Sequence, residues 1–527
     1  MENMLVPAPT DAVISEYEAA RFLIQATYGA KLDEIRSLQR TGYEAWIDEQ
    51  MAMPASLQEP CMQATLNDPN QPLYQNSRIE AWYLNSVEGE DQLRQRTAFA
   101  LSQIFVVSSE SGNLALEVMG LAKYYDYLAI NAFGNYRDIL EDITLNTMMG
   151  FYLGMFRNAK ADPVAGTQPD ENYAREILQL FSVGLHQLHM DGTPVLVNGN
   201  PIPTYNQGVI ENFARIFTGW NYNGCPENNW HYCGPFDSQV NQYGPMQPIE
   251  SYHDTGAKTL LNGESVAAGQ TAQEDLDAAL DNIFNHPNVP PFISKQLIQR
   301  FVTSNPSPAY VERVANVFVN NGNGVRGDLA AVIRSILLDQ EARDINLINN
   351  ASYGKLKEPI IRQIALWRAF NAKSQNGRFQ FWNPEFAFQQ KPLGSPSVFN
   401  FFAPSYQLPG PIRDAGLVSP EFQITNETTV MTVSNEFNHS TNRGYYDYFY
   451  AQQGQPLLQL KREELLQNTP AALIEHMNLL MYAGQMSANT RTVLTDFFES
   501  LESANPVQRI ASLIYVVMLS PEYVVQR

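Results

Sequence analysis

The chain has 527 residues, 44% of them hydrophobic and 11% aromatic, so it can bury a large core and is too apolar to be disordered. Lys and Arg number 34 against 55 Asp and Glu, a formal net charge of −21 that argues against nucleic acid and against an anionic membrane surface as partners. Apolar runs stay shorter than the roughly 18–20 residues that a transmembrane helix needs, so we expect no membrane span.

The N-terminal stretch MENMLVPAPTDAVISE has neither the basic segment nor the apolar segment that a signal peptide needs. We predict that residues 1–14 form a tail. The protein is therefore expected either to stay inside the cell or to be exported with a signal that this sequence does not contain.

Helical periodicity dominates the rest of the chain, because apolar residues recur at the i, i+3, i+4 and i+7 spacing of amphipathic helices. The spacing predicts helices at 15–28, 31–50, 91–108, 114–131, 170–183, 207–218, 273–285, 290–303, 308–320, 327–338, 355–370, 457–467, 470–482, 487–500 and 505–518. Alternating patterns are scarce, and the best one, TPVLVNGNPIPTY, predicts a β-hairpin that turns at Asn198 and Gly199. We therefore predict an all-α protein, a large multi-helix orthogonal array with a small β-hairpin insertion and long ordered loops.

Three stretches, 54–75, 221–270 and 372–425, lack a helical pattern and are predicted to be loops. Loops of this length in a compact chain are often functional. The third stretch is predicted to be a loop-rich connection between a larger helical lobe at 15–371 and a smaller C-terminal helical lobe at 426–527.

Two nearly identical pentapeptides, ENYAR and ENFAR, begin at Glu171 and Glu211, each inside a predicted amphipathic helix. In each copy the Glu stands four residues before an Arg, the favourable order for an intrahelical ion pair. One interpretation is two surface helices, each with its own pair. The other is that the polar edges face each other and form one partly buried cluster of Glu171, Arg175, Glu176, Glu211 and Arg215. Such a cluster could fix the helix packing or hold a substrate, since Arg can bind carboxylates through two hydrogen bonds.

The segment YHDTGAKTLL contains a second candidate binding site, formed by His253, Asp254 and Lys258. A carboxylate beside an imidazole can orient it as a general base. The alternative is a polar turn, in which Asp254 starts an Asx-turn and Gly256 supplies the backbone freedom.

Two further features lie outside the main helical pattern. Cys225 and Cys233 flank PENNWHY, and they predict either a short disulfide hairpin, if the protein is exported, or two free thiols. In GYYDYFYAQQG, the rings of Tyr445, Tyr446 and Tyr448 could bind a sugar or a peptide, or could pack against helices.

The remaining motifs predict neither a metal site nor a cofactor. GNGVRG at 322–327 has the glycine spacing of a dinucleotide-binding loop, but it follows a predicted helix rather than a strand. His186 and His189 are three residues apart, yet Gly184 is predicted to end the helix that would bring them together.

Several stretches resemble one known family. PDENYAREILQLFSVGL is similar to the ENYARELLELxTLG signature of the DUF1800 proteins, and ENFARIFTGW is similar to their ARxFTGW signature. AARFLIQATYGAKLDEIRSL, HPNVPPFISKQLIQRFV and SPSVFNFFAPSY resemble further blocks, so the resemblance covers roughly residues 15–525. It implies a mostly helical bacterial protein that is commonly exported and often encoded beside DUF1501 proteins. Asn146 and Phe181 stand where many relatives have His, so a mechanism that uses those imidazoles does not carry over.

Two functions follow, and they leave open whether the protein is an enzyme. The first is an exported binding or assembly protein, at the cell surface or on an extracellular polymer, with a DUF1501-type protein as a candidate partner. The second is a carboxylate-dependent hydrolase of glycosidase type, with Glu171, Glu176 and Glu211 as catalytic residues. A hydrolase requires two carboxylates about 5–10 Å apart across an open cleft. Assembly predicts instead that Arg175 and Arg215 pair with these acids and close them to solvent.

Overall fold

The computed structural model describes residues 14–69, 71–381, 383–446, 454–501 and 504–527. Within them the chain is predominantly helical, and its strands form four two-stranded antiparallel pairs. The prediction of an all-α array with a small hairpin is therefore confirmed. Among the described helices, none is both long enough and apolar enough to cross a bilayer.

The helices of the N-terminal half begin in different ways, and only some of them have a side-chain cap. They are α1 (Glu16–Ala26), α2 (Leu32–Thr41), α3 (Tyr43–Ala52), α4 (Glu59–Leu66), α5 (Gln75–Glu88), α6 (Gln92–Ser102), α7 (Val118–Ile130), α8 (Tyr136–Leu145), α9 (Thr147–Leu153), α10 (Asn172–Gln179) and α11 (Gln207–Ile216). Before α1, the Ser15 hydroxyl accepts from the Glu18 amide and the Glu18 carboxylate accepts from the Ser15 amide, which forms a capping box. Asn135 and Asn206 cap α8 and α11 in the simpler way, by accepting from one first-turn amide.

The helices of the C-terminal half often start at proline. They are α12 (Ala272–Asn285), α13 (Val289–Phe301), α14 (Pro308–Val319), α15 (Leu329–Leu338), α16 (Gln340–Arg343), α17 (Pro359–Ala369), α18 (Pro384–Phe388), α19 (Pro411–Asp414), α20 (Glu427–Tyr446), α22 (Lys461–Leu466), α23 (Pro470–Tyr482), α24 (Ala488–Ser500), α25 (Pro506–Leu519) and α26 (Pro521–Val524). Proline suits this position because the first-turn amides of a helix have no intrahelical partner and the proline ring presets a helical φ.

The strands are short and close loops rather than forming a sheet. β1 (Leu196–Val197) pairs with β2 (Asn200–Pro201). The turn between them places Asn198 at φ 53° and Gly199 at φ 81°, as a two-residue hairpin turn requires. The other pairs are β3 (Trp220–Asn221) with β4 (Gln247–Pro248), β5 (Lys258–Thr259) with β6 (Ser265–Val266), and β7 (Lys355–Leu356) with β8 (Val525–Gln526).

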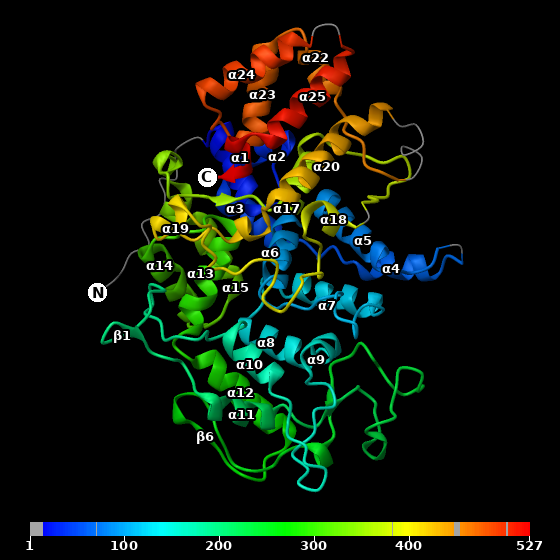
Figure 1. The fold of residues 1–527 in the computed structure, drawn as a ribbon, viewed down its shortest axis with the longest axis vertical. Coiled ribbons are helices and arrows are strands. Elements are labelled where there is room, and N and C mark those ends of the chain that lie inside the picture. The colour runs from blue at the N-terminus through cyan, green and yellow to red at the C-terminus, as the bar shows by residue number, and fades with distance from the viewer. Residues whose placement is uncertain (1–13, 70, 382, 447–453, 502–503) are drawn as a thin grey trace.

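The first and last helices of the chain lie at the same end of the molecule (Figure 1). α1 contacts α23, and β8 joins the C-terminal segment to β7. Arg21 on α1 donates its Nε to the carbonyl oxygen of Arg527 at 3.0 Å. Helices α8 to α12 form the opposite end, and α5, α6, α13 and α17 lie between the two ends (Figure 1).

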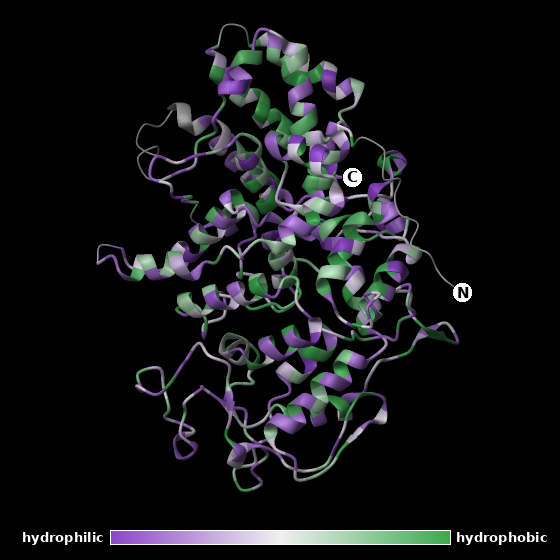
Figure 2. Ribbon diagram, turned by 180° about the vertical axis from the view of Figure 1, so that it is seen from behind, coloured by the Kyte–Doolittle hydropathy of each residue, from purple (hydrophilic) through white to green (hydrophobic). Residues whose placement is uncertain are grey.

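One hydrophobic cluster runs through the molecule, from Ala19 on α1 to Tyr523 on α26. Near its middle, Tyr83 packs against Trp82 at 5.1 Å and against Trp367 at 5.3 Å between ring centroids. Figure 2 shows apolar and polar residues alternating around the helices, as packing on a common core requires. Helices from both predicted lobes contribute to this cluster. The division into two lobes stays a prediction.

Four charged side chains and one amide are buried together in a group that we call the central network: Gln103, Arg300, Lys355, Glu358 and Glu421. Each of them is at most 4% exposed. Lys355 Nζ lies 3.0 Å from Glu421 Oε1 and donates to the Arg300 carbonyl oxygen at 2.9 Å. Gln103 donates its Nε2 to Glu358 at 2.6 Å. Because buried charges are tolerated only when paired, this network fixes how α6, α13 and α17 pack.

Candidate functional site

The two pentapeptide segments are helical and lie against each other, as α10 and α11 (Figure 1). Tyr173 of α10 packs edge-on against Phe217, the residue after α11, with ring centroids 5.0 Å apart. Ala174 and Ala214 are buried at equivalent positions of the two motifs. The repeated pattern therefore buries the same face of each helix.

The polar edge of this helix pair holds part of the predicted cluster. Arg175 Nη2 lies 3.0 Å from Glu171 Oε2. Gln207, in the first turn of α11, donates its Nε2 to Glu171 at 2.9 Å and to Glu211 at 3.3 Å, and so links the helices. The side chains of Arg175 and Glu171 are 41% and 34% exposed, and Glu211 is exposed as well. Water therefore reaches this edge, and its ion pair contributes little stability.

Arg215 lies elsewhere, which corrects the prediction of a single five-residue cluster. Its guanidinium donates from Nε to Asp254 Oδ2 at 3.0 Å and from Nη2 to Oδ1 at 2.9 Å. The predicted intrahelical pair of Glu211 with Arg215 is replaced by this contact. The physical reason is that Asp254 is already fixed, because its Oδ1 accepts from the Gly256 amide at 2.9 Å. A fixed carboxylate binds both guanidinium nitrogens with less loss of entropy than an exposed glutamate.

Two members of the predicted group, His253 and Lys258, meet at Asp275 of α12, a residue that sequence analysis missed, whereas Asp254 pairs with Arg215. His253 Nε2 lies 3.0 Å and Lys258 Nζ lies 2.5 Å from the same oxygen, Asp275 Oδ2. His253 Nδ1 faces the carbonyl oxygen of Thr218 at 3.0 Å. His253, Lys258 and Asp275 are at most 2% exposed. These three residues are therefore closed to solvent and hold α12 to the segment that follows α11.

Glu176 differs from the other two candidate carboxylates. It is 5% exposed, and its Oε2 has no hydrogen-bond partner in the part of the chain that the structure describes. Burial raises the pKa of Glu176, with a smaller opposing effect from Arg175. Burial and the nearby Glu176 charge also raise the pKa values of Tyr152 and Tyr205 to about 12. A carboxyl group that keeps its proton more tightly is suited to act as a general acid.

Residues 222–246, between β3 and β4, form a loop that we call the aromatic loop. Its base is anchored by Arg157, which donates its Nε to Asn221 Oδ1 at 3.2 Å and its Nη1 to the His231 carbonyl oxygen at 3.1 Å. Gly224 has φ 82°, and a Cβ there would lie 1.9 Å from the Gln239 carbonyl oxygen, so only glycine fits. The path of the loop is therefore set by specific contacts.

The tip of the aromatic loop presents two rings to solvent. Tyr232 is 88% exposed and Phe236 is 99% exposed. Elsewhere in the same loop, Trp230 is buried and stacks on Tyr252 with centroids 4.2 Å apart and an interplanar angle of 9°. The loop therefore combines a packed base with an apolar, exposed tip. The loop at 221–270 was predicted, but the exposure of these two rings was not.

Cys225 and Cys233 lie together inside the base of the aromatic loop. Both are buried, and both pack with Tyr222 in one small hydrophobic cluster. They are free thiols in this structure. Burial and the adjacent Cys233 sulfur raise the pKa of Cys225 to about 12. The two sulfurs are thus neighbours, and the disulfide stays a prediction.

The tyrosine platform falls at the edge of the described chain. Tyr445 and Tyr446 are the last residues of α20, and their side chains lie outside the described part of the structure. Tyr448 lies outside the described residues altogether. Their proposed role in binding stays a prediction.

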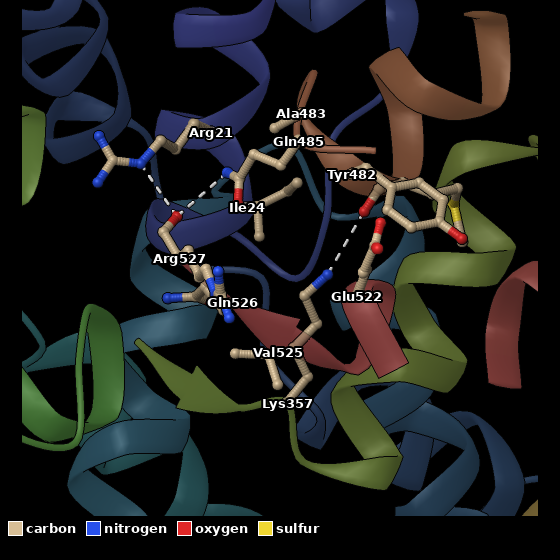
Figure 3. Close-up of a pocket in the computed structure, with 11 residues that line it drawn as sticks. Arg21, Ile24, Lys357, Tyr482, Ala483, Gln485, Glu522, Val525, Gln526 and Arg527 are labelled. Carbon is tan, nitrogen blue, oxygen red and sulfur yellow. Dashed lines mark hydrogen bonds between the residues drawn. The ribbon is translucent and has the colours of Figure 1, made fainter. Parts of the chain in front are cut away.

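The pocket shown in Figure 3 is too small for a substrate. Its volume is about 10 Å³, which accommodates about one water molecule. Lys357 lines it, and burial with the nearby Arg362 charge lowers the pKa of that lysine to about 7. Its ammonium group lies 4.1 Å from the centroid of the Tyr523 ring.

Among the described residues, no group of three or more His, Cys, Asp or Glu side chains could hold a metal ion.

Comparisons with known proteins agree with the motifs. No curated protein and no solved structure matches the chain. The model of the family DUF1800, described as a protein of unknown function, matches residues 21–525. Because this match spans nearly the whole chain, the protein belongs to the DUF1800 family.

Proposed function

We propose that the chain is an exported binding protein and that the aromatic loop holds its partner. The observation that carries this proposal is the exposure of Tyr232 and Phe236, at 88% and 99%, on a loop with a buried base. Aromatic residues dominate the affinity of many interfaces, and full burial of one ring contributes about 2–3 kcal/mol. Two rings on one loop could therefore supply most of the affinity for a partner.

The scaffold beneath the loop supports the same role. Arg215 stands before the aromatic loop and Asp254 stands after it, so their two hydrogen bonds close the loop's base. Arg157 adds contacts inside the base. A loop that is held in place before binding loses less conformational entropy on binding, which improves affinity. The ENFAR motif then acts as a positioning element for the loop.

We infer that the partner is an extracellular polysaccharide. Tyrosine and phenylalanine faces stack on the apolar faces of sugar rings, while amide side chains bond to sugar hydroxyls. The loop sequence YNGCPENNWHYCGPFDSQVNQYGPM supplies both kinds of group and carries little positive charge. A DUF1501-type surface protein is the alternative partner.

Export is part of the proposal. Two thiols placed side by side in a surface loop are suited to form a disulfide in an oxidising compartment. Cys225 and Cys233 are neighbours at the base of the aromatic loop, which we propose binds the partner. Once the protein is outside the cytoplasm, the disulfide would fix the conformation of the loop.

Co-sedimentation tests this proposal. The full chain is mixed with insoluble cell-surface polysaccharide from a producing strain, and the bound fraction is measured against polymer concentration. Tyr232→Ser/Phe236→Ser should weaken binding at least about tenfold, which corresponds to about 1.4 kcal/mol. Phe386→Ser is the matched control, because Phe386 is 76% exposed on α18, outside the loop. Unchanged binding by the double variant, with an unchanged melting temperature, would overturn the proposal.

A second function, carboxylate-dependent hydrolysis, is supported by the raised pKa of Glu176. A glycosidase needs one protonated acid, and Glu176 is the candidate carboxylate whose surroundings favour the proton. Glu171 is instead held by Arg175 and Gln207. Release of reducing ends from the same polymer, abolished in Glu176→Gln and retained in Glu211→Gln, would establish this function. If the wild-type protein releases no reducing ends, hydrolysis of that polymer is excluded.

A further inference from the structure

Lys258 and Asp275 form a buried contact that polymer binding by the aromatic loop does not require. Lys258 Nζ, on β5, lies 2.5 Å from Asp275 Oδ2, on α12, and these residues are 2% and 0% exposed. Lys373 Nζ lies similarly close to Glu88 Oε1, at 2.6 Å, but both of those side chains are more exposed. Burial removes the water that stabilises separate charges, so an uncharged amine and acid are more accessible to the buried pair than to the exposed pair.

The surroundings of Lys258 fix the direction in which its amine can react. Nζ donates to the carbonyl oxygens of Asp254 at 2.5 Å and Gly256 at 3.0 Å. The third hydrogen of the ammonium group is donated to Asp275 Oδ2. When that hydrogen moves to the carboxylate, the lone pair of Nζ is left facing the Asp275 carboxyl group. Groups that are held in contact and aligned react far faster than groups that meet in solution.

His253 supplies an acid and a base at the same carboxyl group. Its Nδ1 lies 3.0 Å from the Thr218 carbonyl oxygen, which can only accept, so Nδ1 carries a proton. Its Nε2 lies 3.0 Å from Asp275 Oδ2, and a hydrogen bond there places a second proton on one of those two atoms. A proton is therefore held beside Oδ2, the oxygen that would leave as water if this carboxyl group reacted with an amine.

The other oxygen of the Asp275 carboxyl group provides an independent observation. Asp275 Oδ1 is buried and has no hydrogen-bond partner among the described residues. A buried carboxylate oxygen without a donor is costly, because both oxygens share the negative charge. The oxygen of an uncharged amide carries no such charge and costs less to bury. Conversion of this carboxylate into an amide would therefore relieve part of the cost.

We propose that Lys258 and Asp275 join in an intramolecular amide bond, with His253 as the catalytic acid and base. A proton first passes from Nζ to Oδ2, which gives an amine and a carboxylic acid. Nζ then attacks the Asp275 Cγ, and the Nζ–Cγ bond forms. Nζ gives up a second proton, which His253 delivers to Oδ2, and the Cγ–Oδ2 bond breaks to release water. One ammonium and one carboxylate thus become one amide and one water, with no oxidant or reductant.

The amide bond would tie β5 to α12 and close residues 258–275 into a ring. Such a ring restricts the unfolded chain, which favours the folded state. Unlike a disulfide, an amide withstands reductants. The segment that follows the aromatic loop would then be held to α12 in every compartment, whether or not the loop binds a polysaccharide.

Mass spectrometry of the denatured and reduced full chain tests the proposal. The wild-type protein should be lighter than its sequence by one water molecule. Trypsin cuts after free lysines, so it should fail to cut after Lys258 and should release residues 216–295 as one peptide. Fragmentation of that peptide should give no ions from backbone cleavage inside the ring at 258–275, which distinguishes this bond from loss of water elsewhere. A wild-type mass equal to that of the sequence, or complete cleavage after Lys258, would overturn the proposal.

Three variants test the roles of the individual residues. Lys258→Arg keeps the charge but should show the full mass of its own sequence, whereas Lys373→Arg, in the exposed pair, should still lose one water. If Lys258→Arg fails to fold, the peptide map of the wild-type protein still decides the outcome. In a cell-free synthesis, His253→Gln should slow the appearance of the cross-linked chain in the soluble fraction at least about tenfold. An unchanged rate in this variant would contradict the role of His253 as the catalyst.

Discussion

Arg215 and Asp254 are joined by two hydrogen bonds across the base of the aromatic loop, at 3.0 Å and 2.9 Å. Their side chains are 29% and 18% exposed, so the pair is partly shielded from water. One residue precedes the loop in the chain and the other follows it. This pair therefore links the ENFAR motif to the aromatic loop, which we propose binds the partner.

Arg215→Ala should lower the free energy of unfolding by about 2 kcal/mol, because it leaves the Asp254 carboxylate without its charged donor. Glu211→Gln is the matched control, since Glu211 is exposed and should change stability by less than about 0.5 kcal/mol. Urea denaturation of both variants measures the difference. Equal small losses would show that the pair does not stabilise the fold.

Glu176→Gln should alter how stability depends on pH. Burial raises the pKa of Glu176 above its ordinary value of 4.5, so the folded protein holds this proton more tightly than the unfolded chain. The stability contributed by this group is therefore present below that value and is lost as pH rises toward the folded pKa. Urea denaturation should show that the stability of the variant relative to the wild type increases as pH rises above about 4.5, and that this increase stops once Glu176 is ionised in the folded wild type. A constant difference between the two proteins would contradict the raised pKa.

The Cys225–Cys233 disulfide should form in protein recovered from outside the cytoplasm. Closing this short loop should stabilise the oxidised protein by about 2–3 kcal/mol relative to Cys225→Ser/Cys233→Ser. Alkylation followed by intact-mass measurement, with and without reductant, counts the free thiols. Cys61→Ser serves as the control, because Cys61 lies in α4 and should not affect the bond. Three alkylated thiols in unreduced exported protein would rule the disulfide out.

Glu421→Ala should lower the free energy of unfolding by about 3–5 kcal/mol, because it leaves Lys355 buried without this counter-charge. Lys355→Met/Glu421→Leu should recover much of that loss, since two apolar side chains need no pairing. The exposed pair of Lys373 and Glu88 provides the control, and Glu88→Ala should change stability by less than about 1 kcal/mol. A double variant no more stable than Glu421→Ala would contradict this account of the central network.

Local patterns predicted much of the fold. The helical spacing and the turn at Asn198 and Gly199 follow from residues near one another in the sequence. The contact between α10 and α11 was suggested instead by the repeated pentapeptide. The partner of Arg215 did not follow, because the local rule favours Glu211 four residues away and the observed partner is 39 residues away. Tertiary structure fixed Asp254 and so decided the pairing.

Other parts of the site had weaker signals or none. Asp275 lies on the stripe of α12 that also buries Ala272 and Ala279, and a charge at such a position suggests a buried partner. That signal was available in the sequence and was missed. A cavity of about 100 Å³, whose lining includes Lys31 and His476, unites segments from both ends of the chain, and no local sequence pattern marks such a meeting.

Site-specific photo-crosslinking in living cells would show whether the aromatic loop contacts cell-surface polysaccharide. A photoreactive phenylalanine analogue replaces Phe236 at the tip of the aromatic loop or, as the control, the exposed Phe386 on α18. Position 236 should cross-link to cell-surface polysaccharide, and position 386 should not. Equal cross-linking from both positions, or none from position 236 in exported protein, would contradict this expectation.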